Sequence, residues 1–156
     1  AGEAPDRVSA ADIVSAARSR LGPGAERVSS ETVADVELWA PRGLVAEAVA
    51  NLLRNALDAS ADGRPVQLAV RVDAPWARFV VSDEGVGMSK EQLARAGEPF
   101  FSTKGVGAGM GLGLFVARAL AEQLGGRLQL TSKVGEGTRA EFVLPVASPE
   151  MRSRAV

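Results

Sequence analysis

The chain has 156 residues, 46% of them hydrophobic, which suits one domain with a buried core. Its 18 Lys and Arg against 19 Asp and Glu leave it almost neutral, which argues against binding to nucleic acid or a membrane surface. Cysteine and histidine are absent, which excludes disulfides, thiolate or imidazole metal ligands and Ser-His-Asp or Cys-His catalysis within this chain. No bilayer-spanning apolar run or signal-peptide pattern is present. Because AGEAPDR is typical of a linker, we expect a fragment of a longer protein.

The first part of the chain predicts two helices with strands between them. Ser9 is a favourable N-cap for a short helix over roughly 10–20. Residues 26–39 alternate β-branched and polar residues, which predicts one or two strands. A longer helix is predicted over about 44–59, and the Asp-Gly pair at 62–63 ends it.

Residues 65–88 predict two strands joined by a turn. PVQLAVRV places the apolar residues 66, 68, 70 and 72 on one face, as in a half-buried strand. DAPWAR is predicted to be the turn, and FVVS a short apolar strand that DEGVGM ends. Ser89 and Gln92 then form a capping box, which predicts the start of a short helix.

The last third predicts a helix and a hairpin. FVARALAEQLGG is an amphipathic helix pattern ended by two glycines, and a KVGEG turn joins the strands RLQLTS and TRAEFVLP. The whole pattern predicts one α+β domain with helices packed on one face of a mixed sheet. We expect a linker and short helix over 1–24, the domain over 25–146 and a flexible tail over 147–156.

Residues 105–115, GVGAGMGLGLF, place glycine at every second position directly before a predicted helix. Glycine at this place lets backbone N–H groups approach a phosphate, whose charge the helix dipole favours. The P-loop is excluded because no Gly-Lys-Ser/Thr occurs, and the dinucleotide fingerprint because the spacing is G-x-G-x-G after EPFFSTK rather than after a strand. A flexible linker is the alternative, although linkers rarely continue directly into an apolar helix.

Two further patterns indicate polar sites. On the helix over 44–59, Glu47, Asn51, Asn55 and Asp58 fall opposite the apolar side. Asparagine is a weaker helix former than alanine by roughly half a kcal/mol, so two of them indicate either a function or only a solvated face. An amide oxygen is a hard, neutral ligand that suits Mg²⁺ already carrying phosphates.

The second pattern is SDEGVGM, in which Asp83 ends an apolar strand and two glycines follow. A plain turn is one interpretation, because Asp and Gly dominate turns. The other interpretation is a nucleobase-binding site, since a carboxylate at the end of a buried strand can accept a hydrogen bond from the amino group of adenine. Glycines beside it would leave room for a flat ring.

Four motifs in this order resemble the catalytic and ATP-binding domains of histidine kinases. NLLRNALDA resembles the N box, DEGVG the first glycine box, EPFFSTK the F box and GMGLGLF the second glycine box, while GEGTRAEFVLP resembles the closing hairpin. The resemblance covers roughly 25–146 and implies the Bergerat fold, a two-layer α/β sandwich shared with gyrase B and MutL. EPFFSTK and GMGLGLF also resemble the redox-responsive RegB/PrrB-like group.

The resemblance implies roles on the long helix. Asn55 would bind the Mg²⁺ that bridges the ATP phosphates, with Asn51 supporting it one turn earlier. Asp58 would order a water or a ribose group, or be only a helix-end carboxylate. Arg54 is expected to face sideways into solvent, although a basic side chain near the N box can also meet phosphate. Glu47 is expected to lie too far away to take part.

The resemblance also implies the base and phosphate contacts. Asp83 would receive the adenine amino group, with Gly85 and Gly87 against the base and Thr138 reaching it through a water. Phe100 and Phe101 would brace a mobile lid that is short for the family, and Lys104 in it would contact the terminal phosphate or only solvent. Backbone N–H groups at the phosphates would come from Gly109, Gly111, Leu112, Gly113 and Leu114.

The function implied is a Mg-ATP-binding catalytic domain that donates the γ-phosphoryl group to a histidine on a dimerisation domain absent from this chain. A response regulator would act with the full-length kinase, and the domain would be cytoplasmic, alone or in a membrane-anchored sensor, without direct contact to membrane or nucleic acid. One alternative is a degenerate ATP-binding interaction module. Another is a gyrase-type ATPase or serine kinase, which uses Glu where Asn51 stands here, so that Asn51 favours the histidine kinase.

Overall fold

A computed structural model describes residues 3–31, 35–60, 63–99 and 112–147 of the chain. Most of the predicted tail lies outside the described residues, as do these predicted lid and phosphate-contact residues: Phe100, Phe101, Lys104, Gly109 and Gly111.

One layer of the fold is a five-stranded sheet in the order β2-β4-β5-β7-β6. Its first pair is parallel and the other three pairs are antiparallel, so the sheet is mixed, as predicted. The strands in chain order are β2 (Val28–Glu31), β4 (Val66–Asp73), β5 (Trp76–Asp83), β6 (Arg127–Lys133) and β7 (Gly137–Pro145).

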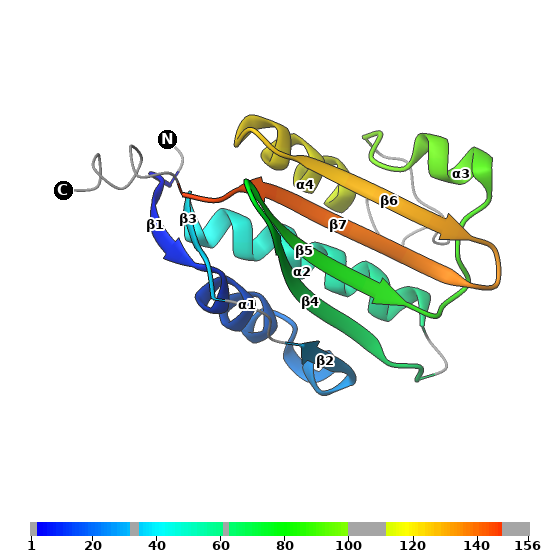
Figure 1. Cartoon of the computed structure of the whole chain (residues 1–156). Coiled ribbons are helices and arrows are strands. Elements are labelled where there is room, and N and C mark those ends of the chain that lie inside the picture. Colours follow the sequence, from blue (N-terminus) through cyan, green and yellow to red (C-terminus); the bar gives the residue numbers. More distant parts are fainter. Residues whose placement is uncertain (1–2, 32–34, 61–62, 100–111, 148–156) are drawn as a thin grey trace.

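The second layer consists of helices on one face of this sheet (Figure 1). Helix α2 (Arg42–Ala59) crosses behind the central strands, between α1 (Ala10–Ser19) and α4 (Gly113–Gln123). A short 3-10 helix, η1 (Gly22–Arg27), follows α1, and α3 (Lys90–Arg95) lies near β6. The predicted α+β sandwich with helices on one face is therefore confirmed.

A small second sheet was not expected. It pairs β1 (Asp6–Ser9) antiparallel with β3 (Glu37–Ala40). The one or two strands predicted over 26–39 are therefore two, β2 and β3, and they belong to different sheets. Ile13 and Ala17 of α1 are fully buried, which packs the first part of the chain against the rest. The division into 1–24, 25–146 and 147–156 stays a prediction.

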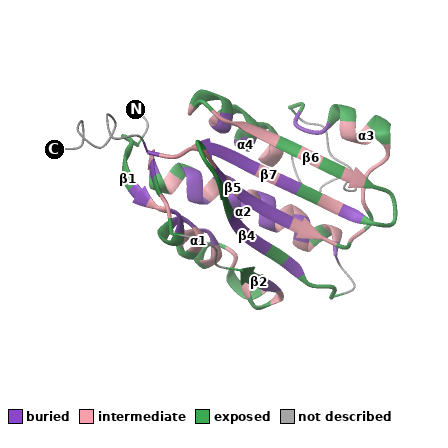
Figure 2. Cartoon of the chain, in the orientation of Figure 1, coloured by how far each residue is buried: buried purple, intermediate pink, exposed green. Residues whose placement is uncertain are grey.

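The core lies between α2 and the large sheet (Figure 2). The predicted apolar side of the helix is buried, and it meets fully buried side chains of β4, β5 and β7, among them Phe79 and Phe142. The α2 residues concerned are Val45, Val49, Leu52, Leu53 and Ala56. Because this side is fixed in the core, the opposite side of α2 is also fixed in direction.

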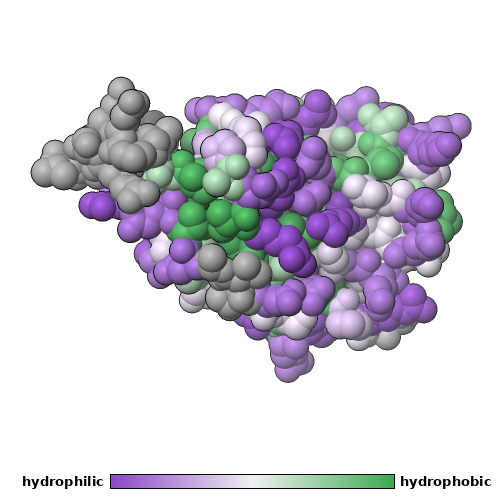
Figure 3. All heavy atoms as spheres, in the orientation of Figure 1, coloured by the Kyte–Doolittle hydropathy of each residue, from purple (hydrophilic) through white to green (hydrophobic). Residues whose placement is uncertain are grey.

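The outer face of the sheet is polar. Side chains alternate along a strand, so Arg78 on β5 and Glu141 on β7 point away from the helices, and their charged groups lie 3.7 Å apart. Arg78 also donates to Gln129 on β6 at 3.1 Å. Figure 3, seen from this side, shows a mainly hydrophilic surface with a smaller hydrophobic area.

Helix ends follow the predicted caps, with one addition. Ser9 accepts from the Asp12 N–H at 3.1 Å, and Ser89 with Gln92 forms the predicted capping box. Helix α2 begins two residues earlier than predicted, where the Glu3 carboxylate accepts the N–H groups of Gly43 and Leu44, both at 3.1 Å. A carboxylate at this end also complements the helix dipole.

The predicted turn DAPWAR is too long. Strand β5 begins at Trp76, which is the register partner of Asp73, so only Ala74 and Pro75 form the turn. The backbone of residues 76–78 is paired on both sides, by β4 and β7, and this tertiary pairing makes the segment part of the strand. Val72, predicted to share one face of a half-buried strand with residues 66, 68 and 70, is 39% exposed, whereas those three residues are buried.

No helix in the described part of the chain combines the length and apolar character needed to cross a membrane.

Leu53→Ala should lower the free energy of unfolding by about 2–5 kcal/mol, because the side chain is fully buried and its loss leaves a cavity. Leu44→Ala is the matched control on the same helix, since Leu44 is 43% exposed, and it should cost about 1 kcal/mol or less. Urea unfolding of both variants measures the difference. Equal losses would contradict the orientation of α2.

Candidate functional site

The predicted site residues come from three elements that meet at one end of the fold. The polar side of α2 faces the first residues of α4: a Cβ placed on Gly113 would lie 3.7 Å from Asn51 Cβ and 3.9 Å from Asn55 Nδ2. Both asparagines are partly buried, whereas Asp58 is exposed. The structure therefore brings the two predicted amides against the N-terminus of the helix that follows the glycine run.

Asp83, at the end of β5, is held by two backbone donors. Its Oδ1 accepts the N–H of Gly85 at 2.9 Å and the N–H of Thr138 at 3.3 Å. Partial burial raises the pKa of the Asp83 carboxyl, and the two hydrogen bonds lower it by a smaller amount. Among the described residues, Oδ2 has no hydrogen-bond partner, so one oxygen is anchored and the other is available to a ligand.

The glycines around Asp83 are required by close backbone contacts. A Cβ on Gly85 would lie 2.3 Å from the Ala59 carbonyl oxygen at the end of α2. Gly87 has a φ of +68°, and its Cβ would lie 1.9 Å from the Lys133 carbonyl oxygen. A Cβ on Gly137 would lie 2.0 Å from the Asp83 carbonyl oxygen. The loop after β5 is thus packed against α2 and the β6–β7 turn, independently of any ligand.

Thr138 lies beside Asp83 and is tied to β6. Its Oγ1 is 2.8 Å from Ser132 Oγ, which accepts the Met88 N–H at 2.8 Å and donates to the Gly137 carbonyl at 2.9 Å. Because the Ser132 proton goes to that carbonyl, Thr138 donates to Ser132 and keeps its own lone pairs. Sequence reasoning missed Ser132, since a serine in a strand gives no local signal.

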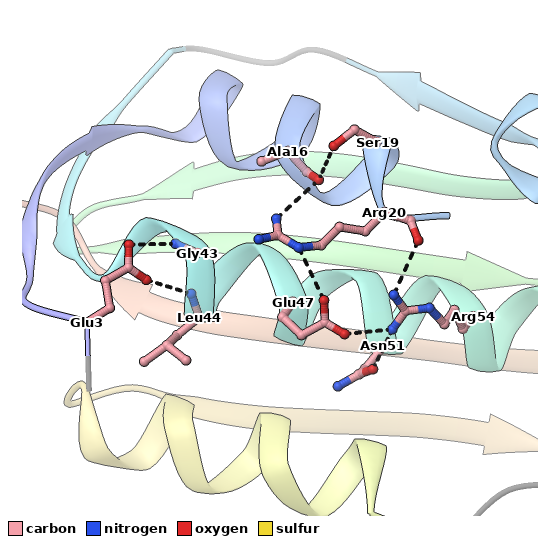
Figure 4. A network of polar contacts seen from close by, with 9 residues as sticks. All are labelled: Glu3, Ala16, Ser19, Arg20, Gly43, Leu44, Glu47, Asn51 and Arg54. Carbon is pink, nitrogen blue, oxygen red and sulfur yellow. Dashed lines mark hydrogen bonds and ion pairs between the residues drawn. The ribbon is translucent and has the colours of Figure 1, made fainter. Parts of the chain in front are cut away.

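Arg54 is partly exposed, as expected, but its guanidinium is engaged by neighbouring groups. Its Nη1 donates to Asn51 Oδ1 at 2.8 Å and to Glu47 Oε1 at 2.9 Å, and its Nη2 donates to the Arg20 carbonyl at 3.3 Å (Figure 4). Glu47 also pairs with Arg20, whose Nε lies 3.2 Å from Oε2. These contacts span α1 and α2, which a helical pattern does not predict.

Comparison with known proteins identifies the family that this fold and site define. Residues 41–148 match the family described as histidine kinase-, DNA gyrase B- and HSP90-like ATPases. The chain belongs to this family of ATP-binding domains.

Its curated relatives are bacterial sensor kinases. The chain is 32% identical to the C4-dicarboxylate transport sensor protein DctB of Pseudomonas aeruginosa over 97% of its own length, and 36% identical to sporulation kinase E of Bacillus subtilis over 62%. It spans only 27% and 13% of the lengths of these two relatives.

Solved structures agree on the fold. The mycobacterial sensor histidine kinase MprB has a TM-score of 0.78 at 23% identity, covering 91% of this chain and 97% of that one. The catalytic domain of the histidine kinase ThkA has a TM-score of 0.79 at 21% identity, covering 90% and 95% respectively.

Asp83→Asn tests how ionisation of the Asp83 carboxyl affects the free energy of unfolding in the absence of a ligand. The raised pKa means that the native state binds a proton more tightly than the unfolded state, so ionised Asp83 lowers the free energy of unfolding as pH rises from about 4 through the raised pKa. Asparagine keeps the oxygen that accepts both backbone N–H groups. The variant should therefore gain in stability relative to wild type over this range.

Urea unfolding at several pH values measures this gain. A variant that becomes relatively less stable toward neutral pH would contradict the assigned cause of the shift.

Proposed function

We propose that this domain binds Mg-ATP and donates the γ-phosphoryl group to a histidine on a dimerisation domain elsewhere in the same protein. The observation that supports this most is the contact of Asn51 and Asn55 with the N-terminus of α4, at Gly113. The N-terminus of α4 favours anions, and the neighbouring amide suits a cation that carries phosphates, so the two lie where Mg-ATP phosphates could bind.

Asp83 would recognise adenine. With Oδ1 engaged by two backbone N–H groups, Oδ2 would accept the exocyclic amino group. The lone pairs of Thr138 Oγ1 would accept from a water that bridges to the ring, in line with its hydrogen bond to Ser132. Gly85 and Gly87 would lie beside the base, because their backbone forms the loop that follows Asp83.

The other end of the site would hold the phosphates. Helix α4 has 11 residues, and the first N–H groups of a helix have no partner within it, so those of Gly113 and Leu114 would donate to phosphate oxygens. Leu112 precedes them as the N-cap. We also propose phosphate contacts for Lys104, Gly109 and Gly111, and a water or ribose contact for Asp58.

Asn55 fits a magnesium ion in its chemistry, because its amide is neutral and partly buried beside this helix end. Its Nδ2 is the atom next to Gly113, so the ligating oxygen would be the atom turned away from that glycine. Mg²⁺ bound with ATP supplies charge neutralisation on the phosphate oxygens. The residues of this chain would hold the nucleotide by its base and its phosphates, and so orient the terminal phosphoryl group. In such transfers most of the catalysis is positioning and charge stabilisation.

The acceptor would lie outside this chain, because the sequence contains no histidine. We propose that the whole protein is a sensor kinase, as the names of its relatives suggest. We also propose that it is cytoplasmic or membrane-anchored and that it acts on a response regulator. A gyrase-type hydrolase is less well supported, since Asn51 cannot act as a base and Glu47 is engaged by Arg20 and Arg54. A degenerate interaction module is disfavoured by the intact Asn55 and Asp83.

Calorimetric titration with ADP and a non-hydrolysable ATP analogue, with and without Mg²⁺, tests this function. Asp83→Ala should weaken binding by about tenfold or more, because it removes a charged acceptor. Asn55→Ala should instead abolish the gain in affinity that Mg²⁺ gives to wild type. Asp73→Ala, on an exposed strand end at the Ala74-Pro75 turn, is the matched control and should bind as wild type does. Absence of wild-type binding to either nucleotide would refute the proposal.

A further inference from the structure

The side chain of Asn51, on the polar side of α2, is held by its neighbours. Asn51 has a guanidinium beside it, since Arg54 Nη1 lies 2.8 Å from its side chain. Arg54 is itself held on two other sides, by Glu47 and by the Arg20 carbonyl. This arrangement limits how the Asn51 amide can be turned.

A guanidinium group carries only hydrogen-bond donors. The atom of the Asn51 amide that faces Arg54 must therefore be its oxygen, and the NH₂ group must point the other way. Figure 4 shows the Asn51 nitrogen turned away from Arg54, on the side of α2 that looks toward α4. Gly113, at the beginning of α4, lies on this same side of Asn51.

An amide that presents its NH₂ group can donate to an anion but cannot ligate a cation. We infer that Arg54 is a positioning residue, which holds Asn51 so that its NH₂ group donates to a phosphate oxygen of the nucleotide instead of supporting Mg²⁺ through its oxygen. Because the phosphate comes with the nucleotide, this inference rests on the proposed function. It assigns Asn51 to the anion, whereas the magnesium role of Asn55 stays as proposed above.

Glu47 and Arg20 complete the arrangement. The Glu47 carboxylate accepts from Arg54 through Oε1 and pairs with Arg20 through Oε2, so it joins the end of α1 to the middle of α2. The Arg54 side chain is 41% exposed, and without these partners its long stem would be free to leave Asn51. The group of three charged side chains has one net positive charge, which also favours a nearby phosphate.

Asn51→Asp tests the polarity of the amide, because it replaces the NH₂ group by an oxygen of the same size. Binding of ADP without Mg²⁺, measured calorimetrically in the presence of a chelator, should weaken by about tenfold or more, since a donor is exchanged for a like charge. Binding of Mg-ADP should weaken as well. If Asn51 instead ligates the metal through its oxygen, the variant should bind Mg-ADP at least as tightly as wild type, because a carboxylate also ligates Mg²⁺. That result would overturn the inference.

A double-mutant cycle tests whether Arg54 acts through Asn51. Arg54→Met keeps an unbranched stem but removes every donor, and it should weaken ADP binding by about threefold to tenfold in the wild-type background. In the Asn51→Ala background the same change should have little further effect. Equal losses in both backgrounds would show that Arg54 contacts the nucleotide directly, and would overturn the inference.

Two more variants complete the experiment. Arg54→Lys should restore part of the affinity, because an ammonium can still donate to the Asn51 oxygen. Arg71→Met is the matched control, since Arg71 lies on β4 and pairs with Glu31 at 3.9 Å, away from Asn51, and it should bind as wild type does. Thermal unfolding of every variant ensures that affinities are compared between folded proteins.

The result for wild type separates the two proposals. If wild-type protein binds neither ADP nor the ATP analogue, the proposed function fails and this inference with it. If wild type binds both but the cycle shows no coupling, only the role of Arg54 is refuted.

Discussion

The burial of one side of α2 is the constraint on which the rest of the site depends. Leu52 and Leu53 are packed into the core, so Asn51 and Asn55 can face only outward, toward α4. Successive helical residues are about 100° apart, so a slip of one residue would turn both amides out of the site. The helix is also held at its ends, by the Glu3 carboxylate at the start and by Arg27, which donates to the Ser60 carbonyl, at the finish.

The surroundings of Asp83 and those of Asn51 are built differently. Around Asp83 nearly every polar contact is made by backbone atoms or by short side chains, and the loop after β5 is fitted tightly between α2 and the β6–β7 turn. Around Asn51 the contacts come from long side chains, Arg20, Glu47 and Arg54, which have many rotamers. The geometry around Asp83 therefore follows from the packed backbone, whereas the geometry around Asn51 depends on ion pairs.

The sequence predicts what depends on neighbours in the chain. The Ser9 cap, the Ser89–Gln92 capping box and the polar side of α2 all follow from residues within one or two turns, and each is found in the structure. Asp83 could be singled out because it ends an apolar strand. The fold class followed from the order of such elements, since few arrangements bury the apolar sides of all of them.

What the sequence could not predict depends on residues far apart along the chain. Arg54 and the Arg20 carbonyl are separated by 34 positions, and the Met88 N–H and Ser132 by 44. The start of β5 at Trp76 was missed because strand pairing, not side-chain composition, decides it. The cap that Glu3 provides for α2 belongs to the same class, since the acceptor lies 40 positions before the amide.

The tightly packed glycines affect how evolutionary variation in such domains should be interpreted. Selection against side chains at 85, 87 and 137 would operate even in a descendant that had lost its nucleotide, because a methyl group there would collide with main-chain oxygen atoms. Conservation of these glycines would therefore indicate only that the fold is retained. The carboxylate of Asp83 has no such steric reason to persist, so its retention or loss in a given descendant would be the better record of whether a ligand is still bound.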